Sequence, residues 1–92
     1  MLLCEVALGK TLDKISSDSY LGPKDMKKYG TNSTWGQGQK TPESNTIVDN
    51  IRIPNGKLVD SKIKKSVLQY NEYIVYDTSQ IKQSYLIVVK KV

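Results

Sequence analysis

The alternation of apolar and polar residues predicts short β-strands at both ends of the chain. In residues 2–9 (LLCEVALG), every second residue from Leu2 to Leu8 is apolar, while Glu5 falls on the opposite face. Residues 83–92 (QSYLIVVKKV) are almost continuously apolar and β-branched up to their lysines. Such residues fit the pleated surface of a sheet, so we expect a strand in each segment.

A third strand is predicted in residues 68–77 (LQYNEYIVYD), which are rich in Tyr, Ile and Val. One face of this strand, which we expect to be the buried one, carries Leu68, Tyr70, Glu72, Ile74 and Tyr76. An ionised carboxylate on a buried face is unfavourable unless it is paired or hydrogen-bonded. Either Glu72 lies at an edge or bonds to a lysine or tyrosine, or it serves a function.

Turn residues suggest how these strands connect. Residues 45–54 (NTIVDNIRIP) form a weaker strand signal, in which Asp49-Asn50 could turn a small hairpin that ends at Pro54-Asn55-Gly56. The link at residues 78–82 (TSQIK) is short, so we expect the strands before and after it to be antiparallel neighbours.

Residues 10–43 have a different composition, rich in Gly, Ser, Thr, Asn and Lys. We expect a long ordered loop anchored by Tyr20, Tyr29 and Trp35, with one helical turn in residues 10–15 (KTLDKI). A loop of this length in a small domain is commonly functional.

The chemistry-bearing motifs in this region are weak. Gly36-Gln-Gly38 could cradle a phosphate only at the start of a helix, and Pro42 follows instead, so a tight turn with close backbone approach is favoured. Trp35 could stack on a ligand or anchor its own loop. Cys4 is expected to pack in the interior, because no histidine is present to activate it.

Composition limits the possible functions further. The chain has 92 residues, no histidine and one cysteine, which argues against an internal disulfide, a zinc cluster or a histidine base. No apolar run is long enough to span a membrane. The net charge of +5 comes mainly from lysines, with Arg52 the only arginine. This balance attracts polyanions in general, although lysines also serve simply as a solvated surface.

Four sequence blocks resemble one known family. They are "LLCEVALGK", "NSTWGQGQKTPES", "IRIPNG" and "LQYNEYIVYDTSQIKQSYLIVV". In this order and spacing they resemble the end of the poly(ADP-ribose) polymerase catalytic domain, an ADP-ribosyltransferase of the diphtheria-toxin-like fold. The match is closest to nuclear, DNA-dependent members that make polymers.

The resemblance implies an α+β fold, predominantly of antiparallel strands, around an NAD cleft. The family transfers ADP-ribose from NAD to protein acceptors or to a growing poly(ADP-ribose) chain and releases nicotinamide, with NAD as a substrate and no metal. Its signature is a His, a Tyr and a Glu on three strands. The glutamate belongs to the "YNEY" strand, which makes Glu72 the expected catalytic residue and puts Tyr70 and Asn71 on the acceptor side.

The resemblance also implies that residues 1–92 are a partial catalytic domain, its C-terminal half. The family's His-Gly pair, its stacking Tyr and its phosphate-covering loop precede the "LLxEVALG" strand, so most NAD contacts are expected upstream of Met1 and activity should require that segment. DNA would act only through other domains, no membrane is expected, and the location would be nuclear or otherwise cytoplasmic. The alternative is a non-catalytic polyanion-binding or protein-interaction module derived from the same fold.

Overall fold

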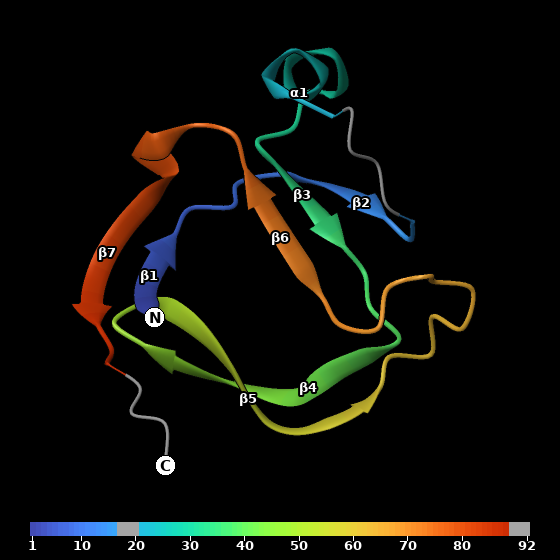
Figure 1. Ribbon diagram of the computed structural model, residues 1–92, viewed down its shortest axis with the longest axis vertical. Coiled ribbons are helices and arrows are strands. Elements are labelled where there is room, and N and C mark those ends of the chain that lie inside the picture. The colour runs from blue at the N-terminus through green and yellow to red at the C-terminus, as the bar shows by residue number, and fades with distance from the viewer. Residues whose placement is uncertain (17–20, 89–92) are drawn as a thin grey trace.

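The computed structural model describes residues 1–16 and 21–88, which form seven strands, an α-helix and a short 3₁₀ helix (Figure 1). In chain order the elements are β1 (Leu2–Val6), β2 (Thr11–Lys14), α1 (Pro23–Tyr29), β3 (Ser33–Gly36), β4 (Lys40–Val48), β5 (Ile51–Asp60), β6 (Glu72–Val75), η1 (Thr78–Gln80) and β7 (Ile81–Leu86).

The strands form three small sheets, not one large one. β1 pairs with β7, β4 pairs with β5, and β2, β3 and β6 form a three-stranded sheet in that order. Only β2 and β3 run parallel; the other pairs are antiparallel. The predicted α+β class with predominantly antiparallel strands is confirmed.

The terminal strands are present and pair with each other. β1 lies within the predicted residues 2–9, and its ladder with β7 has a bulge between Leu3 and Cys4. β7 begins two residues earlier than the sequence pattern predicted. The last four residues of the expected strand, 89–92, lie outside the described part of the chain.

The prediction that the last two strands are neighbours is wrong, because β6 pairs with β3 while β7 pairs with β1. The intervening η1 turns the chain away. The Asp77 carboxylate accepts a hydrogen bond from the Ser79 N–H at 2.9 Å. The Gln80 side-chain amide donates to the carbonyls of Ala7 at 3.0 Å and Asn32 at 2.9 Å. These bonds direct the chain toward β1.

The hairpin predicted around Asp49-Asn50 is confirmed and is longer than expected. Both turn residues have positive φ, 51° and 65°, as the favoured two-residue hairpin turn requires. Residues 54–56 do not end the hairpin: β5 continues through them to Asp60, opposite a bulge between Pro42 and Ser44 in β4.

Residues 10–43 are not a long loop, because β2, α1 and β3 lie within them. Residues 10–15 supply a strand and not the expected helical turn. The helix α1 follows Gly22, whose N–H is bonded by the Asp25 side chain at 2.8 Å, and it ends at Gly30 in the left-handed conformation. Tyr29 is half exposed and anchors nothing, and Tyr20 lies outside the described residues.

The described chain buries little hydrophobic surface. Met26 is its only buried large apolar side chain, and its sulfur lies beside the hydroxyls of the buried residues Thr31 and Thr34. The accessible surface is 7635 Å², whereas a compact 10.4 kDa monomer exposes about 5,400 Å². The radius of gyration of 14.6 Å likewise exceeds the value of about 12 Å for a compact domain of this length. The apolar faces of the sheets are therefore largely uncovered.

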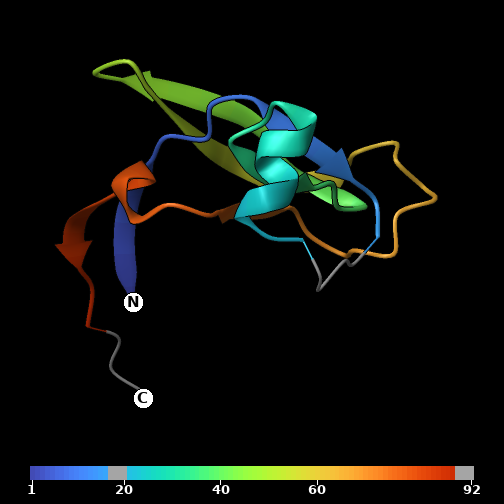
Figure 2. The same cartoon turned by 90° about the horizontal axis from the view of Figure 1, so that it is seen from above.

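The arrangement of the sheets explains this exposure. Figure 2 shows the β4–β5 hairpin and the β1–β7 pair extending away from the central β2–β3–β6 sheet. In Figure 1, α1 lies at the end of the molecule opposite the hairpin. No helix of the described part is long and apolar enough to cross a membrane.

Candidate functional site

Glu72 is the first residue of β6 and stands opposite Gly36 in the β3–β6 ladder. From this point alternation holds: Glu72, Ile74 and Tyr76 line one shallow hollow together with Thr34 of β3. The hollow has a volume of about 40 Å³. The sequence pattern therefore placed these three residues on one face correctly.

The expectation that this face is buried is wrong. Glu72 is exposed, and Ile74 is 46% exposed. The Glu72 carboxylate makes no hydrogen bond or ion pair with any described residue. A structural bond from Glu72 to a lysine or tyrosine is thus absent from the described residues, and an exposed, unpaired carboxylate beside a hollow is available to a ligand.

Two hydroxyl groups lie on the same side of the sheet. Thr34 and Tyr76 are hydrogen-bonded to each other at 2.9 Å, and the Met26 sulfur accepts from Thr31 at 3.3 Å. The bond to Thr34 holds the Tyr76 hydroxyl beside the Thr34–Ile74 pair, which is two residue pairs away from Glu72. Sequence reasoning missed Thr34, because nothing in the β3 pattern distinguishes it from its neighbours.

Gly36 shapes the hollow by lacking a side chain. A Cβ there would lie 3.4 Å from the Glu72 Cβ and 2.7 Å from the Leu68 Cδ1. It would therefore fill part of the space beside the carboxylate. The sequence marked this glycine only as part of a tight turn.

Asn71, directly before Glu72, makes three side-chain hydrogen bonds within the described chain. Its Oδ1 accepts from the Gly38 N–H at 2.9 Å and from the Trp35 indole at 3.3 Å, and its Nδ2 donates to the Thr41 hydroxyl at 3.1 Å. Gly38 permits this contact, because a Cβ there would lie 2.3 Å from the Tyr70 carbonyl carbon. The predicted close backbone approach is confirmed, and a strand follows it, not a helix.

Trp35 anchors the sheet through Tyr73. The two rings are opposite each other in the β3–β6 ladder and stack with centroids 6.1 Å apart and planes 9° apart. Tyr73 and Trp35 lie on the face of the sheet opposite to Glu72. The expectation that Trp35 anchors its own segment is confirmed.

Tyr70 and Asn71 line a different hollow from Glu72. This groove of about 380 Å³ lies between the β4–β5 hairpin and the β3–β6 pair, and its lining includes Trp35 and Arg52. The predicted shared face of Tyr70 and Glu72 is wrong, because β6 begins only at Glu72 and Tyr70 makes a single parallel bridge to Lys40.

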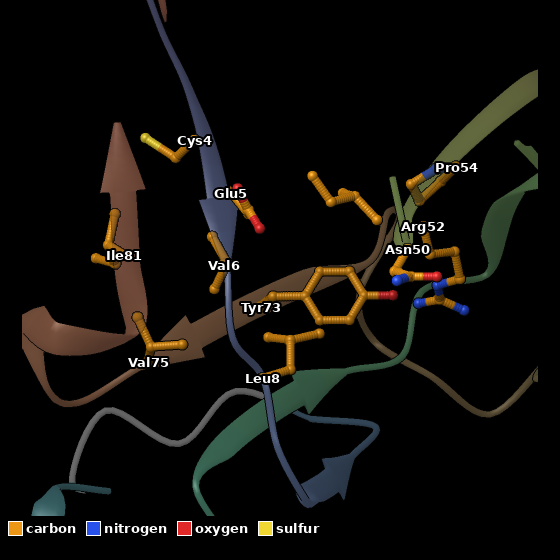
Figure 3. A pocket seen from close by; sticks show the side chains of 11 residues that line it. Cys4, Glu5, Val6, Leu8, Asn50, Arg52, Pro54, Tyr73, Val75 and Ile81 are labelled. Carbon is orange, nitrogen blue, oxygen red and sulfur yellow. The ribbon is translucent and has the colours of Figure 1, made fainter. Parts of the chain in front are cut away.

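A third hollow, of about 630 Å³, lies between β1, β6 and the hairpin. Figure 3 shows Tyr73 reaching across it toward Asn50 and Arg52, with Val6 nearby on β1. Cys4 also lines this groove and is half-buried, so it is less enclosed than expected. The lining is mainly apolar.

The described residues contain no group of three His, Cys, Asp or Glu side chains placed to hold a metal ion. Hydrogen bonds from the backbone and side chain of Ser79 lower the pKa of the Asp77 carboxyl. This residue caps η1 and does not line the Glu72 hollow.

Comparison with known proteins places the chain in a family. The model of the poly(ADP-ribose) polymerase catalytic domain matches residues 1–91. The chain is 42% identical to "Poly [ADP-ribose] polymerase 1" and 43% identical to "Poly [ADP-ribose] polymerase 2" of Arabidopsis thaliana, in each case over 98% of its length. It is 38% identical over 94% of its length to "Poly [ADP-ribose] polymerase" of Drosophila melanogaster.

The chain corresponds to only a small part of each relative. It spans 9% of the first Arabidopsis protein and of the Drosophila protein, and 14% of the second Arabidopsis protein. The family match nevertheless covers nearly every residue, from the exposed glutamate strand to both terminal strands. The chain therefore belongs to the poly(ADP-ribose) polymerase family and matches its catalytic domain.

Proposed function

We propose that this chain supplies the glutamate strand of an NAD-dependent protein ADP-ribosyltransferase. The enzyme would transfer ADP-ribose from NAD to protein acceptors or to a growing poly(ADP-ribose) chain and release nicotinamide. The observation that carries the proposal is the state of Glu72. It is exposed and unpaired among the described residues, while the residues around it are held by hydrogen bonds and stacking.

The proposed chemistry needs a free carboxylate. When the bond between ribose and nicotinamide breaks, nicotinamide leaves with the electron pair and positive charge develops on the sugar, as in glycoside cleavage. At about 4 Å and an effective dielectric near 20, a carboxylate attracts a unit positive charge by about 4 kcal/mol. That free energy corresponds to about three decades of rate.

Glu72 would also act on the acceptor. Its carboxylate can accept a hydrogen bond from a ribose hydroxyl and can take the proton from the attacking hydroxyl as the new bond forms. Tyr70 offers the acceptor-side contact, because its side chain is 50% exposed, and Asn71 adjoins it. The Asn71 amide itself already has three partners.

The described residues fit this role only in part. A hollow of about 40 Å³ is far smaller than the several hundred Å³ that enclose ligands of ordinary size. Most contacts to NAD would therefore come from polypeptide beyond this chain. The excess accessible surface, about 2,200 Å² over a compact monomer, is of the size of an obligate interface. Both observations support a requirement for an upstream catalytic-domain segment.

The decisive experiment joins the chain in cis to the upstream catalytic-domain segment of the second Arabidopsis relative, here called the joined enzyme. We expect nicotinamide release from NAD by the joined enzyme and not by the chain alone. Glu72→Gln keeps the shape and removes the charge, so it should lower turnover about 10³-fold and abolish polymer growth. Glu43→Gln, an exposed change in the hairpin, is the matched control. Normal polymer yield from Glu72→Gln would refute the proposal.

The exposed apolar side chains favour a second candidate, a protein-interaction or polyanion-binding module without catalysis. Titration of the isolated chain with NAD, DNA and poly(ADP-ribose) separates the two. Salt-sensitive polyanion binding, together with an inactive joined enzyme, would favour the module. The family assignment supports a nuclear location, with DNA acting through domains outside this chain, and localisation of the tagged parent protein tests this.

A further inference from the structure

Asn71 occupies the position at which the backbone ladder of β6 stops. β6 is an edge strand of the described sheet, paired with β3 alone, and the pair Gly36–Glu72 is the last rung at this end. Backbone attachment resumes before Asn71, where the carbonyls of Leu68 and Gln69 accept from the N–H groups of residues 39 and 40, each at 2.9 Å. The conformation of Glu72 therefore depends on how the residue before it is held.

The Asn71 side chain continues the attachment past the last rung. Its oxygen accepts from the Gly38 N–H at 2.9 Å and the Trp35 indole at 3.3 Å, and its amide nitrogen donates to Thr41 at 3.1 Å. These partners belong to β3, to the link after it and to β4. One side chain thus joins the start of β6 to two other strands.

Two further contacts act on the same point. The missing side chain of Gly38 lets the backbone of Tyr70 and Asn71 approach the link, where a Cβ would lie 2.6 Å from the Asn71 nitrogen. One residue past Glu72, Tyr73 stacks on Trp35. Glu72 is therefore held on both sides through its neighbours, while its own carboxylate has no partner among the described residues.

We propose that Asn71 is a positioning residue that fixes the direction of the Glu72 carboxylate. This inference rests on the proposed catalytic role of Glu72. Asn71 acts through Glu72 and not on a reacting atom, because its Oδ1 and Nδ2 both bond within the chain and it lines a different hollow from Glu72. A displacement of about 1 Å at a reacting group can lower the rate about 100-fold, so loosening Asn71 lowers turnover without removing the carboxylate.

A double-mutant cycle in the joined enzyme tests the inference. Asn71→Ala should lower kcat for nicotinamide release about 10- to 100-fold, with the KM for NAD changed less than about 2-fold. In the Glu72→Gln background, Asn71→Ala should lower kcat by less than about 3-fold, because there is no carboxylate left to position. Single-turnover measurement with labelled NAD reaches the low rates of the double variant.

Three companion variants separate positioning from general stability. Asn55→Ala removes another asparagine that bonds two hydroxyl side chains, Ser44 and Thr46, but it lies in the hairpin away from β6. It should leave kcat unchanged. Thr41→Val removes one of the three Asn71 partners and should have a small effect. Asn71→Asp keeps both acceptor bonds and should retain more activity than Asn71→Ala. Trp35 fluorescence and thermal melts establish that each variant is folded.

The outcomes distinguish this inference from the proposed function. Full activity of Glu72→Gln overturns the proposed function itself. If Glu72→Gln is impaired but Asn71→Ala is fully active, or lowers kcat equally in both backgrounds, the positioning role is overturned. It is also overturned if Asn55→Ala loses as much activity as Asn71→Ala. If Asn71→Ala fails to fold, the kcat values of the wild type, Thr41→Val and Asn71→Asp are compared instead. Equal kcat in all three proteins refutes the positioning role.

Discussion

Glu72 and Gly36 face each other across the β3–β6 ladder, and the absent side chain of Gly36 keeps space open beside the carboxylate. The backbone of Gly36 has no positive φ, so an alanine would be tolerated conformationally. Its Cβ would come closest to the far end of Leu68, at 2.7 Å, and would lie 3.4 Å from the Cβ and 3.5 Å from the carbonyl oxygen of Glu72. The glycine is thus explained by the hollow and not by a turn.

Gly36→Ala should therefore reduce NAD turnover by the joined enzyme at least about 10-fold, while the free energy of unfolding falls by only about 1 kcal/mol as Leu68 shifts. Steady-state nicotinamide release and denaturant melts measure the two effects. Gly22→Ala, where a Cβ meets nothing within 4 Å, is the matched control. Equal turnover in the two alanine variants would show that the hollow beside Glu72 is not used.

Gly38→Ala should lower the free energy of unfolding more than Gly36→Ala does. Its Cβ would lie 2.3 Å from the Tyr70 carbonyl carbon and 2.6 Å from the Asn71 nitrogen, and backbone cannot swing aside as a side chain can. We expect unfolding to become easier by about 1–3 kcal/mol, measured by urea denaturation against Gly22→Ala. A urea midpoint equal to that of the wild type would show that the link between β3 and β4 does not pack closely against the residues before β6.

The Trp35–Tyr73 stack should be visible by fluorescence, because Trp35 is the only tryptophan. Tyr73→Leu keeps an apolar side chain but removes the stacked ring, which should cost about 0.5–1.5 kcal/mol and shift Trp35 emission to longer wavelength. Tyr29→Leu, an exposed tyrosine on α1, serves as the control. Unchanged emission in Tyr73→Leu would exclude the stack.

The hairpin turn offers a stabilising change. Asn50 has a φ of 65°, a conformation that glycine adopts without strain. Asn50→Gly should raise the free energy of unfolding by a few tenths of a kcal/mol, whereas Asn50→Val should lower it by about 1 kcal/mol or more. Thermal melts of the three proteins should rank glycine, asparagine, valine, and a different order would contradict the turn geometry.

Asp77 gives a pH dependence of known sign. Hydrogen bonds from Ser79 lower the pKa of its carboxyl in the folded state. Because the folded-state pKa is lowered, the ionised Asp77 carboxylate stabilises the folded protein at pH values above the unfolded pKa, near 3.9. This contribution to the free energy of unfolding is lost as the pH falls through the folded-state pKa. NMR titration should place the Asp77 pKa of the folded protein below the unfolded value. Asp77→Asn should flatten the dependence in this acid range, and a normal Asp77 pKa would contradict the cap.

Sequence patterns correctly predicted the elements that depend on neighbouring residues alone. Alternation identified β1 and the Glu72–Tyr76 segment, and Asp49-Asn50 identified the hairpin turn. The same reasoning extended the alternation back to Tyr70 and failed, because the start of β6 is set by the bonds of Asn71 to residues more than thirty positions away.

The remaining errors have a common physical origin in distant contacts. The side chain of Gln80 bonds Ala7 and Asn32, and this separated two strands that a short link would have paired. The buried face expected for Glu72 assumed that the chain covers its own sheets, which it does not. The roles of Glu72, Tyr70 and Asn71 came from family resemblance, since an isolated acid in a strand has several explanations.

The pairing of β1 with β7 has a consequence for biosynthesis. Leu2 lies opposite Leu86, so β1 leaves the ribosome about 80 residues before β7. Until then the edge of β1 that pairs with β7 lacks this partner. The first strand should accordingly be a point of chaperone contact during translation, and its closure a late step in folding.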